Sequence, residues 1–202
     1  MNQNNKKLEL LGSIPIQKAL LTLGLPTMIG MLINALYNIV DTYFVGGLGT
    51  HQMGAVTVVF PLGQIIVGLG LLFGNGAAAY LSRLLGCGDK DTANKVTSTA
   101  LYSSLFVGAI MIIFSVIFLK PILKQIGAID NVMPYAMTYA RIYITFSIFN
   151  IFNVTMNNIV SSEGSAKTAM SALLAGALLN VILDPFFIYT FDYGIAVAAI
   201  AT

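Results

Sequence analysis

The stretch LLNVILDPFFIYTFD, Leu178 to Asp192, places Asp184 and Pro185 inside an otherwise apolar run. In water, an aspartate followed by a proline would end an ordinary helix. In lipid, a carboxylate at the centre of a helix costs about 2.5–3.5 kcal/mol on insertion scales, and proline also removes a backbone hydrogen bond. A sequence that keeps both in a membrane span is therefore expected to use them.

The rest of the chain has the composition of an integral membrane protein. Of its 202 residues, 57% are hydrophobic and 9% are charged, with a mean hydropathy of +0.84, whereas soluble domains carry about 25% charged residues. The net charge of +2 is too small to indicate nucleic acid as a partner. No Cys/His group has metal-ligand spacing and no nucleophile–base arrangement is visible. We therefore predict a protein that is not an enzyme and binds no metal or cofactor.

Five apolar segments, each long enough to cross a bilayer, follow one another along the chain. A sixth segment begins near 194, and the connections between segments are polar or rich in glycine and proline. No alternating pattern indicates a transmembrane barrel. The sequence therefore predicts an all-α membrane protein, a polytopic bundle with spans at about 17–44, 53–80, 94–119, 133–160, 168–190 and, in part, 194–202.

Positive charge is unevenly divided between the two sides of the predicted membrane. The N-terminus and the connections 82–95 and 161–167 share one side, with seven Lys and Arg residues: Lys6, Lys7, Lys18, Arg83, Lys90, Lys95 and Lys167. The other side holds two, Lys120 and Lys124. The positive-inside rule makes the first side cytoplasmic. We expect a multi-pass protein of the cell membrane with a cytoplasmic N-terminus.

Two acidic residues, Asp41 and Asp184, lie well inside predicted spans. Each falls a turn or two before the outer end of its span, and Thr202 lies about eight residues below the outer start of the sixth span. With a rise of about 1.5 Å per residue, all three lie within about 15 Å of the outer boundary. Asn180 is one turn before Asp184 on the same face. Carboxylate, amide and hydroxyl oxygens suit a hard cation or a proton, although intramembrane asparagines also serve simply to join helices.

The backbone of the first two spans carries two further signals. Glycine is dense in the second span, at Gly63, Gly68, Gly70, Gly74 and Gly76, which favours close helix packing through small residues. Pro26 falls in the cytoplasmic part of a first span longer than the ~30 Å hydrocarbon core. We expect a bend or tilt of that span at Pro26.

Four stretches taken in order resemble the N-terminal half of the multidrug and toxic compound extrusion (MATE) transporters. They are GLPTMIGMLINALYNIVDTYFVGGLG (24–49), FGNGAAAYLSRLLGCGD (73–89), SSEGSAKTAM (161–170) and LLNVILDPFFIY (178–189). The resemblance covers essentially the whole chain and implies a twelve-helix fold in two six-helix lobes. Residues 1–202 would be the N-terminal lobe, truncated in helix 6, of a transporter that exports amphipathic, often cationic drugs. A proton or sodium gradient would drive this antiport.

The resemblance also implies a cation site in this lobe. It would contain Asp41 on helix 1, Asn180 and Asp184 on helix 5, and Thr202 on helix 6. Tyr37, Tyr139 and Asn157 would line the lobe cavity. The implied partners are small-molecule drugs, the lipid bilayer and a missing C-terminal lobe, without which the chain should not transport.

Two alternatives remain beside the antiporter. A lipid-linked sugar flippase of the same wider superfamily has a similar helix count, but the two costly carboxylates favour ion coupling. A helical membrane subunit without a solute path would instead tie its intramembrane polar residues into fixed helix contacts.

Overall fold

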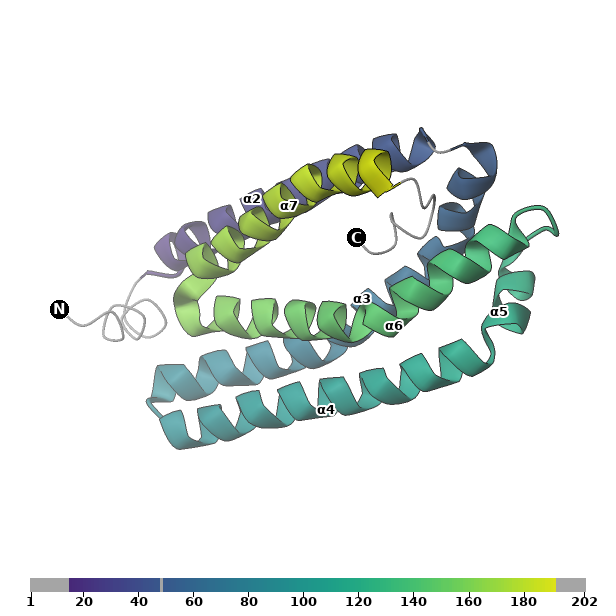
Figure 1. Ribbon diagram of the computed structural model, residues 1–202. Coiled ribbons are helices and arrows are strands. Elements are labelled where there is room, and N and C mark those ends of the chain that lie inside the picture. Colours follow the sequence, from purple (N-terminus) through teal and green to yellow (C-terminus); the bar gives the residue numbers. More distant parts are fainter. Residues whose placement is uncertain (1–14, 48, 192–202) are drawn as a thin grey trace.

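The computed structural model describes residues 15–47 and 49–191, and these residues form helices and no strand (Figure 1). The helices are α2 (Ile16–Gly46), α3 (Thr50–Cys87), α4 (Lys90–Ile117), α5 (Leu119–Ile126), α6 (Met133–Val160) and α7 (Ala166–Phe191), with a π-helical turn, η1 (Ser161–Ser165), between the last two. The five long helices coincide with the first five predicted spans, which confirms the all-α fold class. The partial sixth span, 194–202, lies outside the described residues.

The long helices have the length and surface of membrane spans. In the part of the chain that the structure describes, four stretches are apolar and long enough to cross a bilayer: Ile16–Val40, Thr50–Cys87, Lys90–Ile117 and Met133–Leu183. The last of these contains both α6 and α7, which are continuous through η1; because the chain reverses at Gly164, whose φ is 78°, the stretch makes two spans. Large apolar side chains cover the outside of the bundle; Leu21 is 72% exposed and Phe149 is 68% exposed. A surface of this kind is unfavourable in water and suited to lipid, so the protein is a multi-pass membrane protein.

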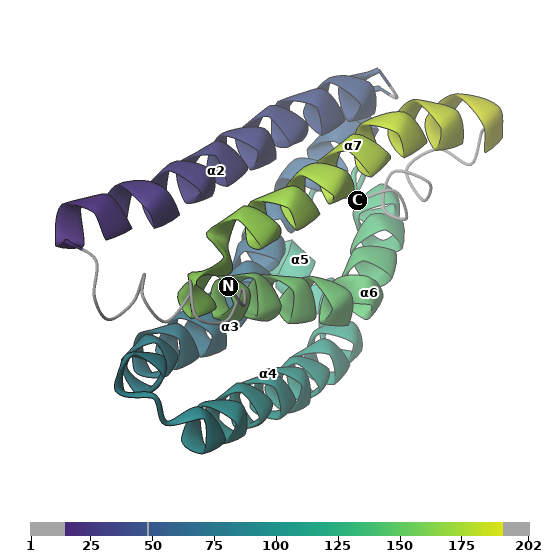
Figure 2. The same cartoon turned by 90° about the vertical axis from the view of Figure 1, so that its left-hand side faces the viewer.

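The helices divide into two groups (Figures 1 and 2). One group, which we call the trio, consists of α3, α4 and α6 packed along one another; the other, the pair, consists of α2 packed along α7. Contacts between α2 and α3 and between α6 and α7 are few. The main buried cluster lies between α3, α6 and the short helix α5, and includes Ile66, Leu123 and Ile144.

Glycines at the α3–α6 interface let the two backbones approach closely. A Cβ atom on Gly70 would lie 2.8 Å from the Cβ of Val154, and one on Gly74 would lie 3.0 Å from the Cβ of Asn158. Beside them the Thr155 hydroxyl donates a hydrogen bond of 3.2 Å to the carbonyl of Gly70. The prediction of close packing is therefore confirmed at these positions and at Gly63, where a Cβ would lie 2.9 Å from the Tyr143 hydroxyl.

The same prediction is wrong for two other glycines of α3. Among the described residues, a Cβ on Gly68 or Gly76 would have no neighbouring atom within 4 Å. These positions point away from the α6 contact, because the helical repeat places them on other faces of α3. Glycine density alone does not tell these faces apart.

The observed helices differ from the predicted spans chiefly in the length of α3 and in the presence of an additional short helix. Helix α3 continues to Cys87, beyond the predicted end at about 80, because Leu81 is buried in a second cluster with Ala93 at the same end of the bundle. The short helix α5 was missed. It buries Leu119 and Leu123 on one side and exposes lysines on the other, so it is amphipathic and too short for the span pattern.

Capping residues at 88 and 89 fix the turn between α3 and α4. Gly88 adopts a left-handed conformation, φ 81°, and its N–H bonds to the carbonyls of Leu84 and Leu85, which ends α3. Asp89 then caps α4 by accepting a hydrogen bond of 3.1 Å from the Thr92 N–H. The hydrogen bonds from Thr92, with a smaller contribution from the charge of Lys95, lower the pKa of the Asp89 carboxyl.

Helix α2 continues through Pro26 without a break (Figure 2). Pro26 and Gly30 are buried, one turn apart. A Cβ on Gly30 would lie 3.2 Å from the Cδ1 of Leu173, so this face of α2 lies against α7. The expected bend or tilt at Pro26 stays a prediction.

Candidate cation and substrate site

The two intramembrane aspartates occupy corresponding positions on the helices of the pair. Helices α2 and α7 run in the same direction and side by side (Figures 1 and 2). Gly30 of α2 faces Leu173 of α7, and eleven residues after each come Asp41 and Asp184. Eleven residues make about three complete turns and a rise of about 16 Å. The helical repeat therefore carries both backbone positions to the facing sides of the two helices and to a similar level.

Amide side chains lie one to two turns below these aspartates. Asn180, one turn before Asp184, is buried at 9% exposure. On α2 the Asn38 amide donates to the carbonyl of Asn34 at 2.7 Å and to its side-chain oxygen at 2.9 Å. Both helices therefore carry amide groups within two turns of the level of the aspartates. Of the four residues predicted for the cation site, Thr202 lies outside the described residues, as do the side chains of Asp41 and Asp184.

Helix α6 contributes a row of polar residues. The Asn157 amide donates a hydrogen bond of 3.2 Å to the carbonyl of Ala169 and so joins α6 to α7 near the turn at η1. Two turns earlier, the side-chain oxygen of Asn150 is buried and accepts no hydrogen bond within the described residues. Ser147 is buried, and its hydroxyl donates 2.6 Å to the Ile144 carbonyl. The fixed contact of Asn157 is the kind expected of a helix-joining residue, and a buried amide oxygen such as that of Asn150 is chemically able to accept from a ligand.

The residues predicted to line a substrate cavity are not brought together in the described part. Tyr139 is 5% exposed and belongs to the main buried cluster, where its ring stacks on Tyr143 with centroids 5.8 Å apart. Asn157 lies near the opposite end of α6, and the side chain of Tyr37 is outside the described residues. Their place in a cavity stays a prediction.

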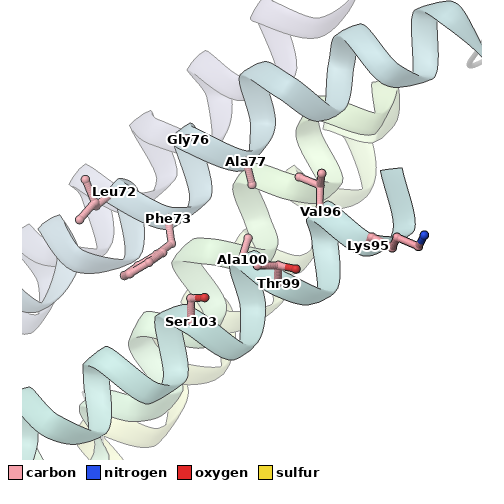
Figure 3. Close-up of a pocket in the computed structure, with 9 residues that line it drawn as sticks. All are labelled: Leu72, Phe73, Gly76, Ala77, Lys95, Val96, Thr99, Ala100 and Ser103. Atoms are coloured by element: carbon pink, nitrogen blue, oxygen red, sulfur yellow. The ribbon is translucent and has the colours of Figure 1, made fainter. Parts of the chain in front are cut away.

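A separate groove that the sequence did not indicate lies between α3 and α4 (Figure 3). Its volume is about 380 Å³. It is lined by Leu72, Phe73, Gly76, Ala77, Lys95, Val96, Thr99, Ala100 and Ser103. The only signal that could have found it is the spacing of Lys95, Thr99 and Ser103 at four-residue intervals, which places the three on one face of α4.

Comparison with known proteins gives consistent results. The chain is 33% identical over 189 residues to the multidrug export protein MepA of Staphylococcus aureus (strain NCTC 8325 / PS 47), which covers 93% of this chain and 42% of that protein. It is also similar to the solved structure of a MOP superfamily transporter from Pyrococcus furiosus, with a TM-score of 0.91, 36% identity and coverage of 98% of this chain and 43% of that one.

A second solved structure, the outward-facing conformation of a multidrug resistance MATE family transporter, has a TM-score of 0.92 and 36% identity and covers 98% of this chain and 44% of that one. The chain thus spans less than half the length of these relatives. The family model described as MatE matches residues 26–186, from Pro26 in α2 to a point in α7 just beyond Asp184. The chain therefore belongs to the MatE family.

Proposed function

We propose that residues 1–202 form the N-terminal lobe of a cation-coupled antiporter that exports amphipathic, often cationic drugs across the cell membrane. Membership of the MatE family supports this proposal, as does the similarity to a protein named for multidrug export. The observation that carries it is the equal register of Asp41 and Asp184. Both come eleven residues after the Gly30–Leu173 contact of two helices that run side by side.

The chemistry of such a pair suits a coupling ion. Two carboxylates at one level, away from bulk water, repel each other when both are ionised, and desolvation also disfavours the charged form. The pair then titrates as a unit and holds a shared proton or a cation, with the Asn180 amide beside it. Loss of that ion would change the packing of α2 against α7. Drug and ion compete if each favours a different packing, which is a coupling free energy between two sites.

The first test is export by the full-length transporter carrying Asp184→Asn. Asparagine keeps the shape and polarity of the side chain but cannot take up or release a proton. We expect normal expression, with export of a cationic dye reduced to the level of cells that lack the transporter. The control is Asp130→Asn, which changes an exposed aspartate in the connection before α6. Full dye export by Asp184→Asn at equal expression contradicts the role of this carboxylate.

The coupling itself is tested by drug affinity. In the purified full-length protein, affinity for the dye should change with pH or with sodium, and Asp41→Asn should remove most of that dependence. If the affinity of the wild type for the dye changes with neither pH nor sodium, the two aspartates have a structural role and do not bind the coupling ion. Selective transfer of a lipid-linked sugar, with no dye export, would favour a flippase. The absence of any transport would favour a non-transporting subunit.

A further inference from the structure

The groove between α3 and α4 has an apolar body and one charged end (Figure 3). Its apolar wall includes Leu72 and Phe73 of α3 and Val96 and Ala100 of α4. Gly76 leaves space on the α3 side, because a Cβ there would meet no described atom within 4 Å. Lys95 lies at the end nearest the α3–α4 turn. Several lining residues, among them Leu72, Gly76 and Thr99, are exposed, so the groove is open to the outside of the bundle, which is apolar and suited to lipid.

Three polar side chains form a line along the α4 wall of this groove. Lys95, Thr99 and Ser103 are four residues apart, so they share one face over about 12 Å of helix. Within the described residues, neither the Thr99 nor the Ser103 hydroxyl makes a hydrogen bond, whereas Ser98 and Ser104 of the same helix donate to backbone carbonyls at 3.0 and 2.8 Å. The line therefore offers two hydroxyls that can still bond to a ligand.

The charge of Lys95 is also available. Among the described residues it forms no ion pair, and its electrostatic influence is felt at Asp89, which is already engaged as the cap of α4. An ammonium group at the end of a span, above an apolar groove, complements a phosphate at the membrane surface. The hydroxyls below it lie where the glycerol and ester oxygens of a lipid would follow, and the apolar wall lies where an acyl chain would continue.

We propose that the groove between α3 and α4 is a binding site for one anionic phospholipid, with its phosphate on Lys95, its glycerol and ester oxygens on Thr99 and Ser103, and an acyl chain along Leu72, Phe73 and Ala100. The volume of about 380 Å³ is in the range of about 300–1,000 Å³ usual for small-molecule sites. Selection for the anionic headgroup comes from Lys95, and retention of the chain comes from the space at Gly76.

The test measures binding of phosphatidylglycerol and of phosphatidylcholine with matched acyl chains to the purified full-length protein, by native mass spectrometry across a lipid titration. The groove-filling variant is Gly76→Leu. Its control is Gly68→Leu on the same helix, where a Cβ also meets nothing within 4 Å but which does not line the groove. The headgroup variant is Lys95→Gln, with Lys124→Gln, an exposed lysine on α5, as its control.

We expect the wild type to bind phosphatidylglycerol about tenfold more tightly than phosphatidylcholine, a difference of about 1.4 kcal/mol. Gly76→Leu should weaken binding of both lipids, and Lys95→Gln should abolish the preference for phosphatidylglycerol, while both controls behave as wild type. Equal phosphatidylglycerol binding by Gly76→Leu and Gly68→Leu overturns the proposal, as does a wild type that binds the two lipids equally. Because the measurement is lipid binding, its outcome is independent of drug export.

Discussion

At the scale of single residues, the close α3–α6 interface depends on glycines, which have no side chain to hold the two helices apart. Gly63, Gly70 and Gly74 lie on the face of α3 that meets α6, and each brings the partner's atoms within 3.0 Å of where a Cβ would stand. The Thr155 hydroxyl bridges the same interface at the Gly70 carbonyl. In lipid, where apolar area gives no net drive for helix association, such close packing and interhelical hydrogen bonds hold the trio together.

Gly70→Ala should therefore destabilise the bundle. The new methyl would lie 2.8 Å from the Cβ and 2.9 Å from the Cγ1 of Val154, a β-branched side chain with little freedom to move. Overpacking of this kind costs about 1–3 kcal/mol. The measurement is thermal unfolding in detergent. Gly68→Ala, with open space around its Cβ, should instead be neutral or slightly stabilising. A Gly70→Ala protein as stable as Gly68→Ala would mean that α6 readily moves aside.

At the scale of elements, the turn between α6 and α7 determines where α7 goes. Gly164 has φ 78°, a conformation that other residues reach at a cost of about 1–2 kcal/mol. Ser82 of α3 donates a hydrogen bond of 3.2 Å to the Ser162 carbonyl, so the turn is also held from the trio. Because of this reversal, two helices that look like one long apolar stretch become two spans.

Gly164→Ala should lower the unfolding midpoint in detergent by an amount that corresponds to this strain. The matched control is Gly176→Ala in α7, where the glycine is helical and a Cβ would have no neighbour within 4 Å in the described part of the chain. The control should match or exceed the wild type, since alanine is the better helix former. If both variants unfold together with the wild type, the left-handed turn is easily replaced by another geometry.

The cap of α4 predicts a dependence on pH. Because the pKa of Asp89 is lowered by hydrogen bonds from Thr92, its stabilisation of the helix start is complete above the usual value of 3.8 and is lost as the pH falls through the lowered pKa. Amide exchange in the first turn of α4, corrected for its intrinsic pH dependence, should accelerate over that range. Asp89→Asn, an equally good cap without a titrating group, should remove this transition. A transition that persists in Asp89→Asn would come from another group.

How much of this was predictable depends on the kind of signal. Apolar runs revealed the five long helices because a bilayer demands about twenty apolar residues whatever the neighbours are. Helix α5 was missed because its eight residues fall below that length, and Leu119 and Leu123 show their role only when packed. Gly68 and Gly76 looked like packing glycines because composition carries no information about which face meets α6. The register of Asp41 and Asp184 required the Gly30–Leu173 contact, which no sequence pattern gives.

At the scale of the whole molecule, the orientation of the bundle can be read from one native thiol. Cys87 is the chain's only cysteine and is exposed at the end of α3, on the side predicted to be cytoplasmic. A membrane-impermeant thiol reagent should label it only after intact cells are made permeable. A Cys87→Ser protein carrying Ile129→Cys, an exposed site at the opposite end, should be labelled without permeabilisation. The reverse pattern would invert the predicted topology.

The two connections between the pair and the trio lie at opposite ends of the bundle (Figure 1). Helix α2 joins α3 through a few residues at one end, and α7 joins α6 through η1 at the other. Two short tethers at diagonal corners resist both sliding of the pair along its own axis and parting of the two groups at either end. The motion they oppose least is torsion about the diagonal that joins them. Rotation of this kind would move the tethered ends least, which are the end of α2 at Gly46 and the start of α7 at Ala166. It would move the start of α2 and the end of α7 beyond Asp184 through the largest arc, so that the level of Asp184 shifts relative to that of Asp41.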